Sequence, residues 1–152
     1  MQQEVRVSFC RLRPHDGEDL DLPQYHSELA AGMDIEADVA GAVTLDPGER
    51  LLIPTGFAAS IPAGYEIQVR PRSGLAIKHG VTVINAPGTI DADYRGEIKV
   101  GLVNLGDAPY TIHRRDRIAQ LVVAPVCRAI VAEVAELDST KRQTGGFGHT
   151  GK

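Results

Sequence analysis

Two strand-like runs flank a polar loop in residues 81–103, which read VTVINAPGTIDADYRGEIKVGLV. The first run is β-branched and apolar and ends at Ala86-Pro87-Gly88, and strand character resumes at 97–103. We therefore predict a β-hairpin whose loop carries Asp91 and Tyr94. A carboxylate held at the mouth of a hairpin can act on a water or a hydroxyl. The alternative is a plain turn with a solvated aspartate, because Asp favours turns through local hydrogen bonds.

The same alternation of short strands and turns extends along most of the chain. Expected strands lie at 5–12, 42–45, 50–53, 57–61, 65–69, 81–85, 97–103, 110–112, 118–125 and 129–134. Turn sequences such as Asp46-Pro47-Gly48 separate them. This spacing predicts an all-β fold, a jelly-roll-like sandwich or barrel. One short helix is expected at 74–78, with Ser73 as its cap and a stop at His79-Gly80.

Length and charge limit the class of protein. A chain of 152 residues suits one domain. The formal net charge of −4 offers no broad basic face to nucleic acid or a membrane surface, so an anion site must be built locally. Cys10 and Cys127 are too isolated for a disulfide framework, and we expect two small core residues in a reducing compartment. No signal peptide or spanning segment is evident, which predicts a cytoplasmic protein.

The C-terminal end has a different composition. Residues 139–152 lose the apolar pattern and are rich in glycine, as disordered tails are. A single aromatic residue, Phe147, also suits an arm that stacks on a flat ligand while glycine N–H groups wrap phosphates. We therefore expect a folded domain over 1–138 and a flexible arm over 139–152. The segment 146–152 has the glycine spacing of a P-loop but neither its flanking elements nor its final hydroxyl, so we reject a Walker site.

Three more segments carry polar groups suited to binding. Arg72 and Ser73 begin the expected helix, where free N–H groups bind anions, although a surface arginine and an ordinary cap are the alternative. Asp34 follows a glycine turn, and Gln120 lies on an apolar strand where its amide needs a partner, in a site or within the fold. The histidines have no metal-ligand spacing, and no Gly-x-Ser-x-Gly elbow is present, so zinc and nucleophilic chemistry are poorly supported.

Taken together, five ordered segments resemble the motifs of the trimeric dUTPases. They are Ala31-Gly32-Met33-Asp34-Ile35, Pro71-Arg72-Ser73-Gly74-Leu75, Gly88 to Glu97, Arg117-Ile118-Ala119-Gln120-Leu121, and Arg142 with Gly145 to Gly151. The resemblance covers nearly the whole chain. It implies a jelly-roll homotrimer with sites shared between subunits. It also implies Mg²⁺-dependent hydrolysis of dUTP to dUMP and pyrophosphate, which keeps uracil out of DNA and supplies dUMP for thymidylate synthesis.

The resemblance assigns the hairpin to the base, the sugar and the water. Asp91 would be the general base that activates a water for in-line attack on the α-phosphorus. Tyr94 would pack against the deoxyribose and leave no room for a 2′-hydroxyl. The uracil edge would meet the hairpin backbone and its neighbours, namely Asn85, Gly88, Thr89, Ile90 and Lys99.

The resemblance assigns the remaining motifs to the binding of the phosphates and to the C-terminal arm. Phosphate oxygens would be held by Arg72, Ser73, Gly74 and Gln120, which stabilise charge on the leaving pyrophosphate, with Arg117 and Asp34 in support. Mg²⁺ would be bound chiefly by the triphosphate, with Asp34 acting through water and no direct protein ligand. The arm would stack Phe147 on uracil, bring Arg142 to the phosphates and add contacts from Gly148, His149 and Thr150.

Two alternatives remain open. A dCTP deaminase of the same fold needs a glutamate on the strand after the hairpin, and residues 98–102 contain none. The second alternative is a jelly-roll module that binds nucleotide without catalysis. The presence of Asp91, Arg72 and Phe147 argues against it.

Overall fold

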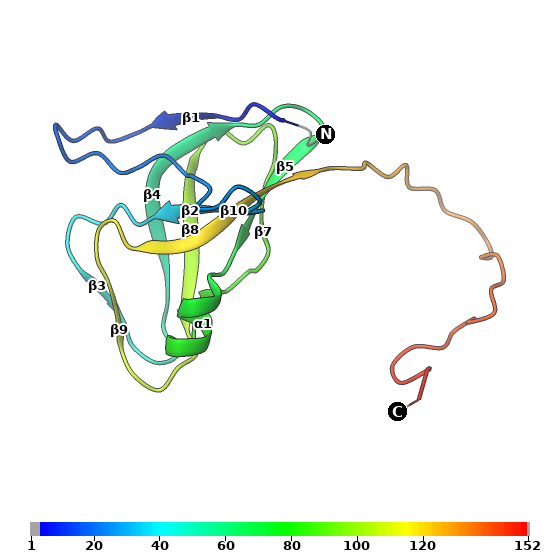
Figure 1. Cartoon of the computed structure of the whole chain (residues 1–152). Helices are drawn as coiled ribbons and strands as arrows, with labels where there is room; N and C mark the ends of the chain where they lie inside the picture. Colours follow the sequence, from blue (N-terminus) through cyan, green and yellow to red (C-terminus); the bar gives the residue numbers. More distant parts are fainter. Residues whose placement is uncertain (1–3, 152) are drawn as a thin grey trace.

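The strands form because apolar and polar residues alternate along them, which leaves one face of each strand for the core. In β8 (Glu97–Asn104), Ile98, Val100 and Leu102 are buried, whereas the intervening Lys99 is exposed. A computed structural model describes residues 4–151 (Figure 1). Its other elements are β1 (Ser8–Arg11), β2 (Met33–Glu36), β3 (Val43–Leu45), β4 (Arg50–Ser60), β5 (Tyr65–Arg70), α1 (Ser73–His79), β6 (Val81–Val83), β7 (Gly88–Ile90), β9 (Tyr110–Ile112) and β10 (Arg117–Pro125).

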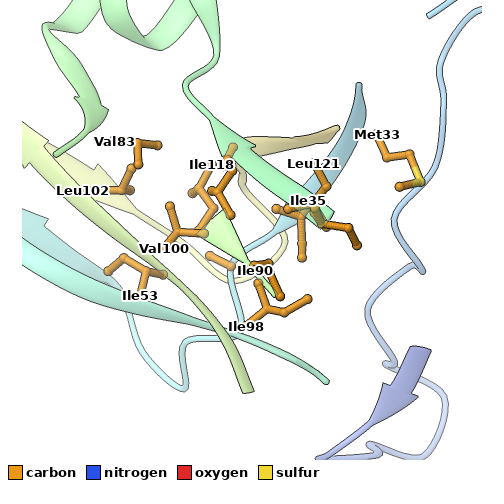
Figure 2. Packing of buried hydrophobic residues seen from close by; sticks show 14 of the residues in the cluster. Met33, Ile35, Ile53, Val83, Ile90, Ile98, Val100, Leu102, Ile118 and Leu121 are labelled. Atoms are coloured by element: carbon orange, nitrogen blue, oxygen red, sulfur yellow. The ribbon is translucent and has the colours of Figure 1, made fainter. Parts of the chain in front are cut away.

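Two four-stranded sheets build the body, with strand orders β1-β4-β8-β6 and β2-β10-β5-β7, and β3 pairs separately with β9. Figure 2 shows buried side chains of both sheets in one cluster, with Ile53 and Val100 from the first sheet and Ile35, Ile90 and Leu121 from the second. Full burial of one such side chain stabilises the fold by about 1.5–3 kcal/mol. The predicted all-β, jelly-roll-like sandwich with one short helix is confirmed.

The hairpin prediction is correct in its strand pairing but wrong about its loop. β6 pairs with β8 as expected, with Val81 opposite Asn104. Residues 88–90, expected to be loop, instead form β7, an edge strand of the other sheet that pairs with β5. Residues 91–96, here named the connecting loop, therefore run from one sheet to the other.

Two more strand predictions need correction. The runs 50–53 and 57–61, predicted as separate strands, belong to one strand, β4, whose register shifts between Pro54 and Ala58. This register shift is a bulge that contains Pro54 and Gly56. Within the bulge Thr55 is fully buried, and its hydroxyl donates to the Ile98 carbonyl at 2.6 Å. β2 was not expected as a strand, since its four residues include Asp34 and Glu36 and give little apolar alternation.

The predicted strand at 129–134 does not form. Ile130 is 98% exposed and Val131 is 91% exposed, because this segment has no neighbouring strand within the described part of one chain. After β10 the chain leaves the sandwich and extends away from it (Figure 1). Cys10 and Cys127 are both exposed, so their prediction as core residues is wrong. No helix in residues 4–151 is long and apolar enough to cross a membrane.

The short helix starts one residue earlier than predicted. Ser73 is its first residue, and the extended Arg72 is the N-cap, without a side-chain cap hydrogen bond. The prediction that Ser73 caps the helix is therefore wrong. Its end is as predicted: Gly80 takes a left-handed conformation (φ 71°), and its N–H donates to the Ala76 carbonyl at 3.0 Å.

Candidate active site

A pocket of about 490 Å³ lies beside β7, the connecting loop and the start of β8. Its lining consists of Leu52, Thr89, Ile90, Asp91, Tyr94, Glu97, Ile98 and Lys99. The fold thus gathers most of the residues that the sequence assigns to the base, the sugar and the water. Asp91 follows β7 directly and is exposed, so a ligand in the pocket can reach its carboxylate.

Hydrogen bonds within the connecting loop hold its shape. The Tyr94 N–H donates to the Asp91 carbonyl at 3.1 Å, and the Tyr94 hydroxyl donates to the Glu97 carbonyl at 2.9 Å. Arg95 Nη1 donates to the carbonyl of Ala92 at 2.7 Å. The side chains of Asp91 and Tyr94 are therefore carried by a turn of defined geometry rather than by a free loop.

Asn85 and Gly88 lie next to each other at the start of β7. A Cβ on Gly88 would come within 3.1 Å of Val69 Cβ and 3.4 Å of Asn85 Nδ2. Glycine is needed here because β5 and the Asn85 amide both approach its backbone closely. Neither Asn85 nor Gly88 is among the residues that line the pocket, although the sequence assigned both to uracil.

The second group of predicted residues gathers around the buried carboxylate of Asp34 on β2. Its Oδ2 lies 3.1 Å from Arg117 Nη1 and 3.4 Å from His26 Nε2. Its Oδ1 lies 3.5 Å from Arg72 Nε and accepts a hydrogen bond from Gln120 Nε2 at 3.3 Å. The amide of Gln120 thus has the partner that its place on an apolar strand requires.

The Asp34 carboxylate fixes the positions of the polar side chains around it. Its side chain is only 8% exposed, and a buried carboxylate is stable only when it is paired and hydrogen-bonded. Arg72 is held a second time, since its Nη1 donates to the Arg117 carbonyl at 3.1 Å. Ser73 and Gly74 follow Arg72 at the start of α1. His26 was not predicted, and only the bridge between Gln24 and Asp34 brings it here.

The pocket and the Asp34 cluster lie apart within one chain. β7 pairs with β5 so that Ile90 faces Ile67, which puts Asp91 near the beginning of β5. Arg72 follows the opposite end of β5, and the extended backbone from Ile67 to Arg72 spans roughly 16 Å. One chain therefore does not bring its own Asp91 to its own Arg72.

The arm residues form turns of their own, away from the sandwich (Figure 1). Arg142 Nε donates to the Gly145 carbonyl at 2.6 Å, and the His149 N–H donates to the Gly146 carbonyl at 2.9 Å. Phe147 is fully exposed. The contacts predicted between the nucleotide and Arg142, Phe147, Gly148, His149 and Thr150 remain predictions.

An ion-pair network next to the connecting loop contains residues to which the sequence assigned no role. Arg13 Nε donates to Asp38 Oδ2 at 2.8 Å, and Arg13 Nη2 donates to Glu97 Oε1. The Gly56 N–H donates to the same Glu97 oxygen at 3.0 Å, and Arg114 Nε lies 3.4 Å from Asp38 Oδ1. These residues come from five distant parts of the chain, so no local spacing signals their association.

The network keeps Glu97 ionised. Burial by itself raises the pKa of Glu97, but hydrogen bonds from Arg13 and the Gly56 N–H leave the pKa below its ordinary value. The bonds to Glu97 and Asp38 raise the pKa of Arg13. Because the pKa of Glu97 is lowered in the folded protein, this carboxylate stabilises the fold above its unfolded pKa, and the contribution is lost as the pH falls through the folded pKa.

The residues around Asp34 suit a metal ion that arrives already bound to a ligand, rather than one held in a preformed protein site. Within residues 4–151, no three His, Cys, Asp or Glu side chains are placed to hold a metal ion. Asp34 is already paired with Arg72 and Arg117, which makes it a poor direct ligand. Mg²⁺ usually keeps several waters and binds substrate phosphates with only one or two carboxylates.

Curated relatives match the chain along nearly all of its length. The deoxyuridine 5'-triphosphate nucleotidohydrolase of Desulfotalea psychrophila is 62% identical over 148 residues, which cover 97% of this chain and 99% of the relative. The protein of the same name from Rhizobium leguminosarum bv. trifolii is 55% identical over 153 residues, covering 99% and 98%.

Solved structures of the same kind share the fold. A variant dUTPase of Staphylococcus bacteriophage 80alpha with dUpNHpp superposes with a TM-score of 0.85 at 26% identity, covering 97% of this chain and 99% of that one. A variant dUTPase of phage phi11 of S. aureus, with a coordinated structural Mg(II) ion, gives a TM-score of 0.76 at 27% identity, covering 88% and 99%. The dUTPase family model matches residues 18–151. The chain therefore belongs to the dUTPase family.

Proposed function

We propose that this protein hydrolyses dUTP to dUMP and pyrophosphate, and so keeps uracil out of DNA and supplies dUMP for thymidylate synthesis. The observation that carries the proposal is the pocket lined by Asp91 and Tyr94 together with Thr89 and Ile90 of β7, in a chain of the dUTPase family. The curated relatives named deoxyuridine 5'-triphosphate nucleotidohydrolase support the same activity.

The pocket would select the base by its hydrogen bonds. The uracil edge would meet the backbone at Thr89 and Ile90, with Asn85, Gly88 and Lys99 nearby. Cytosine presents an N4 donor where uracil presents an acceptor, so its binding would leave buried polar groups unpaired, which costs far more than a missing apolar contact. Thymine would be excluded by its 5-methyl group.

Tyr94 would select the sugar. Its ring lines the pocket, and its hydroxyl is already occupied by the Glu97 carbonyl, so it presents an apolar face to the ligand. A deoxyribose would pack on that face. A ribose would have to bury its 2′-hydroxyl against the ring without a partner.

Asp91 would act as the general base. An exposed carboxylate at the end of a rigid strand can orient a water and take its proton as the oxygen attacks the α-phosphorus in line. Arg72, Ser73, Gly74 and Gln120 would hold phosphate oxygens, and Asp34 with Arg117 would keep Arg72 and Gln120 aimed at them. The positive charge of Arg72 and the hydrogen-bond donors of the other three residues would stabilise the departing pyrophosphate.

The substrate would bring Mg²⁺ with it. Bound to the triphosphate, the ion would neutralise phosphate charge, and Asp34 would lie within reach through water rather than as a direct ligand. The phi11 dUTPase with its structural Mg(II) ion supports a role for magnesium in the family. We place the enzyme in the cytoplasm, where it meets the nucleotide pool.

The active unit would be a homotrimer with shared sites. The separation of Asp91 from Arg72 within one chain supports this arrangement, in which the base and the phosphate-binding residues of one site would come from different subunits. The arm, 139–152, would close over the nucleotide from the remaining subunit, with Phe147 on the uracil and Arg142, Gly148, His149 and Thr150 near the phosphates. Its present extension away from the sandwich leaves it free to reach a neighbour.

A panel of nucleoside triphosphates tests the activity. With Mg²⁺, the protein should release pyrophosphate from dUTP about 10³-fold faster, in kcat/KM, than from dTTP, dCTP or UTP. Equal turnover of UTP would contradict the role of Tyr94. Ammonia released from dCTP would indicate a deaminase, and tight dUTP binding without pyrophosphate would indicate a binding module.

Subunit mixing tests the shared site. Asp91→Asn and Arg72→Ala homotrimers should each be inactive, yet co-expression in equal amounts should restore about one quarter of wild-type activity. Random assembly makes about three quarters of the trimers mixed, and in a cyclic trimer each of these has one site of three with both residues intact. The measurement is pyrophosphate release per subunit. If both residues came from one subunit, mixing would restore nothing.

A further inference from the structure

The Tyr94 ring is held in place by the residues that follow it. Its hydroxyl donates to the Glu97 carbonyl at 2.9 Å, and a Cβ on Gly96 would overlap that hydroxyl, so the ring lies close over the Gly96 backbone. The orientation of the ring therefore depends on the position of the Glu97 main chain.

Glu97 is fixed in turn through its own carboxylate, which is only 15% exposed. One oxygen, Oε1, accepts both the Arg13 guanidinium and the Gly56 N–H, the latter at 3.0 Å. Charge-assisted hydrogen bonds of this kind are about twice as strong as neutral ones. The carboxylate is thus tied to the β4 bulge and to the segment after β1, while the main chain of the same residue holds Tyr94.

Arg13 is itself held from the other side by Asp38. This carboxylate is 5% exposed and accepts Arg13 Nε at 2.8 Å. The left-handed Gly56 packs against it so closely that a Cβ there would lie 2.7 Å from Asp38 Oδ2. Arg13 therefore joins a buried and a largely buried carboxylate around one point of β4, which is a rigid support for the connecting loop.

We propose that Arg13 and Glu97 are positioning residues for sugar selectivity, because their ion pair fixes the Glu97 main chain and through it the Tyr94 ring. The inference rests on the proposed packing of Tyr94 against the deoxyribose. The pocket lining includes Glu97 and not Arg13, so Arg13 acts on the ligand only through Glu97.

Loss of the ion pair should change the orientation of the Tyr94 ring more than it lowers the rate of hydrolysis. Without Arg13, the largely buried Glu97 carboxylate loses its cationic partner and must turn toward water or toward Lys99, and the carbonyl that holds Tyr94 moves with it. A displacement of about 1 Å in an active site can change rates by about 10²-fold. A tilted ring leaves space for a 2′-hydroxyl, so discrimination between dUTP and UTP falls.

The test is the ratio of kcat/KM for dUTP to kcat/KM for UTP, measured by pyrophosphate release for the full-length protein. Arg13→Met should lower this ratio about tenfold, mainly through a lower KM for UTP. Arg114→Met is the matched control, because it removes the other cationic partner of Asp38 without touching Glu97, and it should leave the ratio unchanged. Glu97→Gln should lower the ratio as well, and combining it with Arg13→Met should lower it no further.

An unchanged ratio in Arg13→Met would overturn the inference, even if stability fell, because the ion pair would then be merely structural. A fall of the same size in Arg114→Met would overturn it too. Should Arg13→Met fail to fold, Arg13→Lys carries the test, since a lysine cannot bond both carboxylates in the same geometry. A wild-type protein that does not cleave dUTP would instead refute the proposed function, which separates the two failures.

Discussion

Replacing Asp91 with asparagine should lower kcat for dUTP by about 10³-fold while the protein still binds the nucleotide. The amide has nearly the same size and shape as the carboxylate but cannot accept the proton of the attacking water. Asp91 lies at the end of β7 and is exposed, so the exchange should leave the fold unchanged. Pyrophosphate release gives kcat, and calorimetric titration with a non-hydrolysable dUTP analogue gives the affinity.

The connecting loop offers a matched control for this variant. Asp93→Asn removes another exposed carboxylate two residues away, outside the pocket lining, and should keep kcat within about twofold of wild type. If Asp91→Asn kept its activity, another group would be the base. If it lost binding and turnover together, Asp91 would be a ligand contact rather than the base.

Deleting residues from Lys141 onward should lower kcat/KM for dUTP by about 10²-fold and leave the proposed trimer intact. The last strand ends at Pro125, and among the described residues the hydrogen bonds of the arm, 139–151, join arm residues only to one another. The arm therefore adds nothing to the sandwich of its own chain and would act only by closing over the nucleotide. Activity assays and light scattering measure the two effects separately.

A single substitution in the full-length chain separates stacking from the rest of the arm. Phe147→Ala removes only the exposed ring, so its loss of activity should be part of that caused by the deletion, on the order of tenfold, since stacking of an aromatic ring on a base is worth about 1–3 kcal/mol. Dissociation of the truncated trimer would mean instead that the arm is a structural element. Full activity after truncation would remove the arm from the catalytic cycle.

Local patterns predicted much of the fold. The alternation in β8 and the three residues of β9 matched the structure closely, because period-two burial and Pro-Gly punctuation are properties of neighbouring residues. β2 and β7 escaped prediction because they are short and carry Asp or Gly, and only their pairing with β10 and β5 makes them strands. The prediction for segment 129–134 failed for the opposite reason, since its β propensity meets no partner strand within residues 4–151.

The sequence by itself determined the family, the all-β class and the residue types that the chemistry uses. The reason is that the order of the motifs and the identity of each side chain are properties of the sequence. Only the tertiary structure decided which of those residues meet. Asp34 binds Arg72, Arg117 and Gln120, and Arg13 ties Asp38 to Glu97, across separations that no local pattern encodes. Such contacts arise from sheet pairing and from the need to neutralise buried carboxylates, and both depend on the whole fold.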